Sequence, residues 1–188
     1  MKKKMEKLND IQKNIGLDFQ NPELLEIALT HRSYLNEHPG AKIQNNERQE
    51  YLGDAVLELI ISDYIFRKYP DKAEGELTSI RSAVVRTESL AEESRKLGIG
   101  EHLRMSKGEE DSGGKDKDYL LANAYEAVLG AIYLDSGMES CVQFVTRTLI
   151  PKIDNIVENN LFIDPKTQAQ EIIQSKYKTT PTYEIVKE

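Results

Sequence analysis

The chain contains 188 residues, carries a formal net charge of −7 and is 30% charged. This length suits one domain with a buried core and at most a small second module. The longest apolar run, residues 127–134, is too short to span a bilayer, and no apolar stretch of a secretory signal follows the basic start. Cys141 is the only cysteine, which excludes an intramolecular disulfide and a cysteine metal cage. A reducing, cytoplasmic setting is expected, and the acidic balance excludes nucleic-acid binding by bulk positive charge alone.

Helical periodicity dominates the sequence and predicts an all-α arrangement over most of it. The expected helices cover residues 8–15, 22–29, 47–69, 87–97, 119–134 and 142–157. Residues 36–46 and 107–118 are polar and rich in turn-forming residues, so both are expected to be exposed loops.

The composition changes near residues 159–160, and a different pattern follows. Asp164 and Pro165 form a helix-start signal, and the helix they begin should run to about Lys178. Residues 182–186 then alternate like a strand. Because a lone strand is not stable without partners, either it pairs with something outside this sequence or the chain is a fragment of a longer protein.

An acidic stripe runs along the helix expected over residues 47–69. At about 100° per residue, Glu47, Glu50 and Asp54 fall within roughly 60° of one another, and Glu58 extends the stripe. The same segment carries Tyr51 and several aliphatic residues, so we expect it to be largely buried. A divalent cation would offset the cost of burying like charges, whereas the simpler alternative is a solvated acidic stripe on an amphipathic helix.

A second segment favours the metal site. Asn123 and Glu126 are the only polar side chains in the apolar stretch 120–131, and they stand three residues apart on one helical face. If the two long helices pack together, these side chains can converge with the acidic stripe on a magnesium ion. The alternative is a structural salt bridge from Glu126 to Arg81 or Arg86.

At this point the sequence resembles a known family. Residues 46–57 (NERQEYLGDAVL) resemble the signature of the ribonuclease III family of double-stranded-RNA endonucleases. Its other motifs follow in order at residues 29–34 (LTHRSY), 74–77 (EGEL), 112–114 (SGG) and 121–127 (LANAYEA), and residues 164–186 resemble the opening helix and strand of a double-stranded-RNA-binding domain.

The resemblance implies a domain organisation and an activity. Residues 1–158 would form an all-α ribonuclease III nuclease domain, 159–164 a linker, and 165–188 an incomplete α/β double-stranded-RNA-binding domain. The family forms homodimers that cut duplex RNA to 5′-phosphate and 3′-hydroxyl products, in ribosomal and messenger RNA processing. Magnesium is the implied cofactor, with Mn²⁺ as a substitute.

The resemblance also assigns roles to individual residues. The implied metal ligands are Glu50, Asp54, Asn123 and Glu126, and Asp54 and Glu126 are the implied catalytic residues. Further positions take other roles: Glu47 and Glu74 as secondary acidic residues of the same valley, Tyr51 as the aromatic that enters a socket on the partner subunit, and Thr167 and Gln170 as contacts to the RNA minor groove.

Two residues depart from the family pattern within the nuclease domain. Asn123 is an amide where the family has a carboxylate, which should lower metal affinity because the ligand loses its charge. It raises a second hypothesis, a ribonuclease III-like dimer that binds duplex RNA without cutting it. Gln49 replaces a leucine and should affect packing or an interface. His31, in the LTHRSY motif, is expected to be structural.

Overall fold

The computed structural model describes residues 2–163, 170, 173–179 and 181–182. Within this part the nuclease region is helical, in the order α1 Lys2–Ile15, α2 Pro22–Ala28, α3 Arg32–Glu37, α4 Glu47–Lys68, α5 Glu74–Val85, α6 Thr87–Lys96, α7 Ile99–His102, α8 Lys107–Asp111, a 3₁₀ turn Gly114–Asp116, α9 Asp118–Thr148 and α10 Ile150–Glu158. The prediction of an all-α nuclease domain is therefore confirmed.

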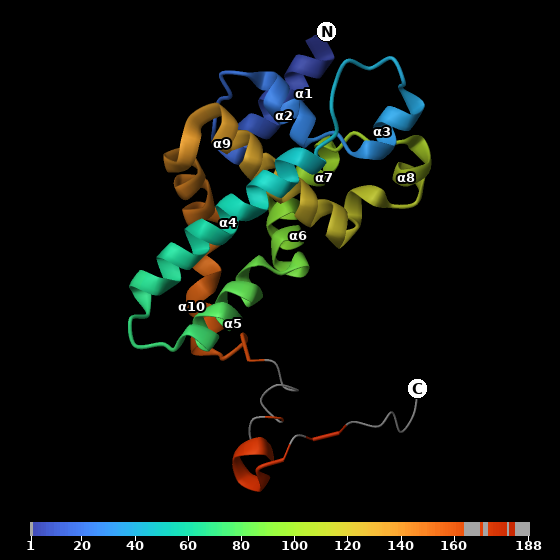
Figure 1. Ribbon diagram of the computed structural model, residues 1–188. Helices are drawn as coiled ribbons and strands as arrows, with labels where there is room; N and C mark the ends of the chain where they lie inside the picture. Colours follow the sequence, from blue (N-terminus) through green and yellow to red (C-terminus); the bar gives the residue numbers. More distant parts are fainter. Residues whose placement is uncertain (1, 164–169, 171–172, 180, 183–188) are drawn as a thin grey trace.

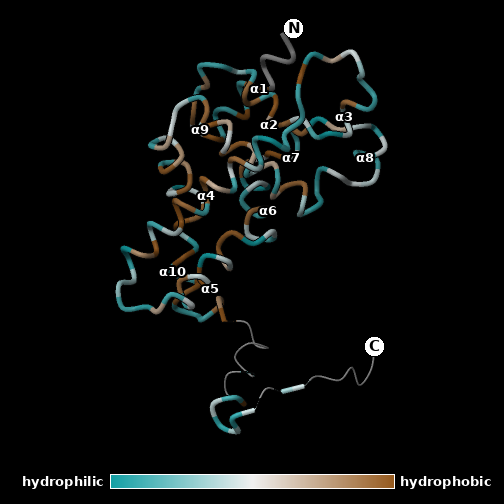
Figure 2. The backbone as a smooth tube through the Cα atoms, in the orientation of Figure 1, coloured by the Kyte–Doolittle hydropathy of each residue, from teal (hydrophilic) through white to brown (hydrophobic). Residues whose placement is uncertain are grey.

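The long helices α4 and α9 form the centre of the fold. They cross in the middle of the molecule, with α1 and α2 at one end and α5 and α10 at the other (Figure 1). The hydrophobic segments concentrate along these packed helices, as the brown stretches in Figure 2 show. Both helices bury aliphatic and aromatic side chains in a shared core, among them Leu57, Ile61 and Ile65 from α4 and Leu121, Tyr125, Val128 and Leu129 from α9.

The prediction that residues 107–118 form a loop is wrong. This segment contains the short helix α8 and the 3₁₀ turn. The Ser106 hydroxyl caps α8 by accepting the Glu109 N–H at 3.2 Å, and Lys117 Nζ bonds Glu109 Oε1 at 2.7 Å. The cap satisfies a backbone N–H at the start of α8 and so stabilises this short helix. Composition alone indicates a loop because it does not reveal such contacts.

Helix boundaries near the C-terminal end of the nuclease region also differ from those expected. Helix α9 continues to Thr148, with a break at Gly137, where φ is +78°. A positive φ costs glycine little, so the chain turns there and resumes as a helix. Helix α10 then begins at Ile150 with Pro151 in its first turn, where proline is tolerated.

The two ends of the acidic helix are fixed by different contacts. Glu47 and Glu50 lie in the first turn of α4, where negative charge is favourable. At the other end Lys68 pairs with Asp154 of α10, and the Tyr69 hydroxyl donates to the same carboxylate at 3.1 Å. The acidic residues therefore occupy the N-terminal turn of a helix whose C-terminal end is tied to α10.

The structure describes only part of the helix and strand predicted for residues 164–186. Residues 170 and 173–177 are helical, in agreement with the expected helix, whereas Thr167 and residues 183–186 of the expected strand lie outside the described residues. No helix among the described residues is long and apolar enough to cross a membrane.

Candidate active site

Helices α4 and α9 approach each other at two glycines. A Cβ atom built on Gly53 would lie 1.8 Å from the Glu126 carbonyl oxygen, and one on Gly130 would lie 2.2 Å from the Gln49 carbonyl oxygen. Only glycine permits such a close approach of two backbones. The crossing therefore places the first two turns of α4 directly against the segment of α9 that carries Glu126.

Three carboxylates interact at this crossing. The pKa of Glu126 is raised to about 8, first by burial and then by the nearby charges of Asp54 and Glu50. Burial also raises the pKa of Glu50, with further contributions from Glu47 and Asp54. Each effect disfavours the charged form of the acid. The structure thus brings together residues that lie about seventy positions apart in the sequence, as the helix spacing predicted.

The alternative of a structural salt bridge at Glu126 is wrong. Arg81 lies 3.9 Å from Glu58 and donates to the Ser62 hydroxyl at 3.0 Å, while Arg86 lies 3.9 Å from Glu88. Within the described residues no lysine or arginine forms an ion pair with Glu126. Its half-buried carboxylate therefore lacks a protein cation that would neutralise it.

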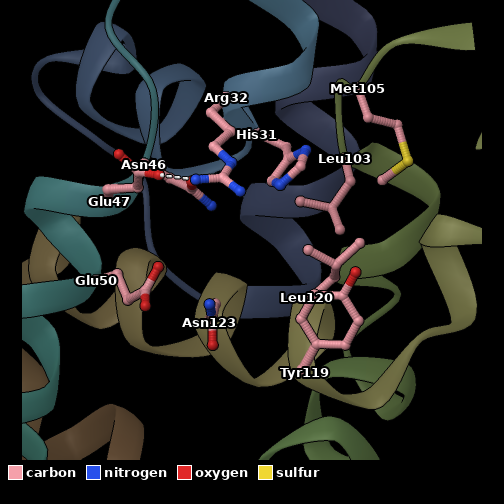
Figure 3. A pocket seen from close by; sticks show the side chains of 10 residues that line it. All are labelled: His31, Arg32, Asn46, Glu47, Glu50, Leu103, Met105, Tyr119, Leu120 and Asn123. Atoms are coloured by element: carbon pink, nitrogen blue, oxygen red, sulfur yellow. Dashed lines mark ion pairs between the residues drawn. The ribbon is translucent and has the colours of Figure 1, made fainter. Parts of the chain in front are cut away.

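A pocket of about 230 Å³ opens beside Glu47 and Glu50, whereas Asp54 and Glu126 are not among its lining residues. In Figure 3, Glu50 from α4 and Asn123 from α9 lie next to each other in its wall. The Asn123 amide lowers the pKa of Glu50 and so favours its charged form, against the larger effect of burial. The pocket walls are completed by His31, Arg32, Asn46, Glu47, Leu103, Met105, Tyr119 and Leu120.

The remaining acidic residues of the prediction occupy different places. Glu47 lines the pocket, and its carboxylate lies 3.6 Å from the Arg32 guanidinium. Glu58 pairs with Arg81 instead and does not line the pocket. Glu74 begins α5 and lines another hollow, of about 430 Å³, together with Leu59 and other residues of α4 and α5. In this single chain, therefore, Glu74 is separate from the pocket of Glu50.

The buried-helix expectation is only partly correct. Tyr51 is 81% exposed and Leu59 is 58% exposed, so one face of α4 is open. Gln49, in contrast, is buried, and its side-chain amide donates to the Leu24 carbonyl of α2 at 3.1 Å. This contact confirms a packing effect for Gln49. Gln170 of the tail is half-buried.

A backbone junction at the LTHRSY motif supports the pocket. The His31 N–H donates to the Arg104 carbonyl at 2.9 Å, and the Arg104 N–H donates to the Leu29 carbonyl at 2.8 Å. The Asn46 N–H donates to the Thr30 carbonyl at 2.9 Å and fixes the residue that precedes α4. The motif thus joins three segments that border the site, which helical periodicity cannot reveal.

His31 caps α3 within this junction. Its Nδ1 accepts the Ser33 N–H at 3.3 Å and lies 2.8 Å from the Ser33 hydroxyl, whose oxygen in turn accepts the Ser106 N–H at 2.9 Å. Since Nδ1 accepts, the ring proton belongs on Nε2. Burial, the largest effect, lowers the pKa of His31. The structural role expected for this histidine is confirmed, although its contribution to the pocket wall was missed.

The donor set suits a hard divalent cation. Carboxylate and amide oxygens are the ligands that magnesium prefers, and it keeps several water ligands of its own. No group of three or more His, Cys, Asp or Glu side chains in the described ranges is already drawn together as a metal cage. Burial and the charges of Asp54 and Glu50 raise the pKa of Glu126, so its charged form is disfavoured without a compensating positive charge.

Comparison with known proteins agrees with this geometry. The family described as Ribonuclease-III-like matches residues 21–153. The chain is 45% identical over 184 residues to Ribonuclease 3 of Listeria innocua and 49% identical over 185 residues to that of Lactococcus lactis subsp. cremoris. Each match covers 98% of this chain and 80% of the relative.

Solved structures give the same result. The nuclease domain of ribonuclease III from Campylobacter jejuni superposes with a TM-score of 0.69 at 38% identity, covering 74% of this chain and 94% of that one. Dicer from Pichia stipitis, at 24% identity and a TM-score of 0.57, shares the fold. The chain therefore belongs to the ribonuclease III family of double-stranded-RNA endoribonucleases.

Proposed function

We propose that Glu50, Asp54, Asn123 and Glu126 hold Mg²⁺, or Mn²⁺ in its place, and that this site hydrolyses phosphodiester bonds of duplex RNA to 5′-phosphate and 3′-hydroxyl ends. The observation that carries the proposal is the position of Glu126: burial beside Asp54 and Glu50 raises its pKa to about 8, and no lysine or arginine of the described residues forms an ion pair with it. A buried acid in this state is costly to the fold, and a bound divalent cation removes that cost.

The chain contributes position and charge to the reaction. Held by these four residues, a magnesium ion would supply an activated water and stabilise the leaving oxygen. Asp54 and Glu126 are the proposed catalytic residues because they approach each other from the two crossing helices and would present anionic oxygens to a bound cation. Asn123 offers a neutral oxygen beside Glu50 and favours the charged form of that acid. The glycine crossing of α4 and α9 fixes these groups relative to one another.

The proposed assembly is a homodimer formed through the open face of α4. Tyr51, Leu59 and Phe66 are 81%, 58% and 69% exposed and lie along one side of that helix. Large exposed apolar side chains in a row are typical of an interaction surface. The related Campylobacter jejuni nuclease domain has structural flexibility in a region involved in dimer formation.

The hollow beside Glu74 supplies a candidate socket for the partner's aromatic ring. It is lined by Leu59, Phe66 and Leu77, and its volume of about 430 Å³ exceeds what one ring needs. A tyrosine placed there keeps its hydroxyl near polar groups such as Thr78. In such a dimer Glu74 would lie close to the partner's site, consistent with a secondary acidic role.

The tail is proposed to begin a double-stranded-RNA-binding domain, with residues 1–158 as nuclease domain, 159–164 as linker and 165–188 as the first helix and first strand of the RNA-binding domain. Thr167 and Gln170 are its proposed minor-groove contacts. The proposed substrates are ribosomal and messenger RNA precursors in the cytoplasm. Because proteins recognise duplex RNA mostly by its shape, we expect recognition not to depend on an RNA sequence motif.

Asn123 supports a second candidate function, a dimer that binds duplex RNA without cutting it. The two functions are separated by incubating the purified protein with long duplex RNA across a magnesium series. Short products with 5′-phosphate ends support the nuclease. Intact RNA at every magnesium concentration, together with retained binding, supports the binder.

A further inference from the structure

One cation lies among the acidic groups of the pocket. Arg32, the first residue of α3, is the one lysine or arginine that lines it among the described residues. Figure 3 shows its guanidinium directed into the same pocket as the side chains of Glu50 and Asn123. Burial lowers the pKa of the neighbouring His31 and so disfavours its charged form. The positive charge at the pocket mouth therefore comes from Arg32.

The guanidinium is only weakly held by the protein. Its ion pair with Glu47 is 3.6 Å long, and the two side chains are 71% and 53% exposed. Exposed ion pairs of this kind contribute little to stability and exchange readily with other partners. Arg104, in comparison, is engaged by Glu26 and stacks over the Tyr34 ring at 4.2 Å.

Other arginines of the nuclease region have structural contacts as well. Arg95 binds the Asp118 carboxylate and also donates to the Asp116 carbonyl at 2.8 Å. Arg147 donates to the Ile15 carbonyl at the end of α1. In contrast, Arg32 is exposed, directed at the site and paired loosely, so it can change partner without loss of packing.

We propose that Arg32 binds a phosphate of the duplex RNA backbone next to the scissile bond, an inference that rests on the proposed nuclease function. The site is acidic and its substrate is a polyanion, so bound metal ions neutralise the carboxylates while the flanking phosphates still need a counter-charge. A guanidinium matches a phosphate through two parallel N–H···O bonds. Glu47 holds the side chain at the pocket mouth until RNA replaces it.

The test begins with Arg32→Gln. Binding of a blunt RNA duplex is measured in chelator, where no cleavage occurs, over a range of salt concentrations. Each bound dimer would lose two phosphate contacts, one from each subunit, so binding should weaken roughly ten- to a hundredfold and the slope of log K against log salt should fall by about two. In magnesium the KM for cleavage should rise by a similar factor while kcat stays near that of the parent. Arg32→Lys should retain the salt slope and part of the affinity.

A matched control is present on α4. Arg67 is 75% exposed and pairs with Asp63 at 2.8 Å, but it does not line the pocket. Arg67→Gln should leave affinity, KM and the salt slope unchanged. Equal behaviour of the Arg32 and Arg67 variants would overturn the proposal.

A second comparison separates phosphate binding from mere positioning of Glu47. If Arg32 acts only by holding Glu47, Arg32→Gln will have no further effect in a Glu47→Gln background. If it binds phosphate, the weaker RNA binding and the lower salt slope persist in that background. A parent that binds RNA but never cuts it disproves the nuclease function, whereas a parent that cuts equally well with Arg32→Gln disproves only this inference.

Discussion

Gly53 and Gly130 lie against each other where α4 crosses α9. A Cβ on Gly53 would be 2.9 Å from the Gly130 nitrogen, and a Cβ on Gly130 would be 3.2 Å from the Gly53 nitrogen. This backbone contact places the acidic turns of α4 beside Glu126. It also means that the requirement for glycine here comes from the approach of two helices and not from a turn, since both residues lie within helices.

Gly53→Ala should destabilise the protein, because its methyl group would meet the Glu126 carbonyl carbon at 2.6 Å and the backbone would have to move. The expected loss is about 1–3 kcal/mol, the usual cost of overpacking a core. Gly75→Ala on α5 is the control, since nothing lies within 4 Å of its Cβ position. Removing glycine from an open helical site should stabilise by roughly 0.5–1 kcal/mol. Denaturant unfolding of both variants measures the two effects, and equal shifts would contradict the crossing.

Glu126→Gln should abolish cleavage and spare RNA binding. The substitution removes an anionic oxygen from the metal site, while the grip on duplex RNA comes from contacts elsewhere. The expected loss in cleavage rate is at least about a hundredfold. Glu139→Gln, the same change at an exposed position of the same helix, is the control and should cut at the parent rate. Cleavage by the Glu126 variant at near the parent rate would show that this residue is not in the site.

The same variant should stabilise the metal-free protein at alkaline pH. Because burial and two carboxylates raise the pKa of Glu126 from 4.5 to about 8, the folded state binds its proton more tightly than the unfolded state does. The stability that this acid contributes in its protonated form is present at low pH and is lost as the pH rises toward and past 8. In chelator, Glu126→Gln and the parent should therefore melt at similar temperatures at low pH. In alkaline buffer the variant should have the higher melting temperature. A difference in melting temperature that does not depend on pH would argue against a link between the ionisation of Glu126 and stability.

Tyr51→Glu should convert a dimer into a monomer. Tyr51 is 81% exposed, so a charge there costs the single protomer little but would be desolvated in an interface. Light scattering at micromolar concentration should give a dimer mass for the parent and a monomer mass for the variant. Val142→Glu, at a 42% exposed apolar position of α9, should remain a dimer. A parent of monomer mass would disprove the proposed assembly.

Much of this site could be predicted from the sequence because its residues lie only a few positions apart on each of two helices. Helical periodicity predicts α4 and the side chains of Glu50 and Asp54 on one face, and it places Asn123 and Glu126 three apart on a second helix. When two such helices pack against each other through the faces that carry these polar residues, the residues come close together. The all-α nuclease domain could be predicted for the same reason.

Other features depend on contacts between distant segments and could not be read from periodicity. The junction at His31 requires Arg104 and Asn46 to meet the LTHRSY segment. Helix α8 depends on a cap and on Lys117. Glu58 carries the same spacing as the site residues, yet Arg81 from α5 engages it. Spacing gives the face of a helix, whereas the neighbouring elements decide which residues on that face form a site.

Asn123→Asp should lower the magnesium concentration needed for half-maximal cleavage. The change adds one negative charge beside Glu50 with almost no change in size, and the number of charged ligands strongly affects affinity at oxygen-ligand sites. The Asn123 amide now favours the charged form of Glu50, whereas an aspartate would oppose it.

The metal-free protein should respond in the opposite direction. A further carboxylate in an acidic pocket increases repulsion, so Asn123→Asp should melt at a lower temperature in chelator and recover on addition of magnesium. Cleavage across a magnesium series measures the change in magnesium requirement, and melting with and without the metal measures the change in stability. If the parent is inert at every magnesium concentration and Asn123→Asp cuts, the parent is the binder. If both cut with the same magnesium dependence, Asn123 does not contact the metal, and the site consists of the three carboxylates alone.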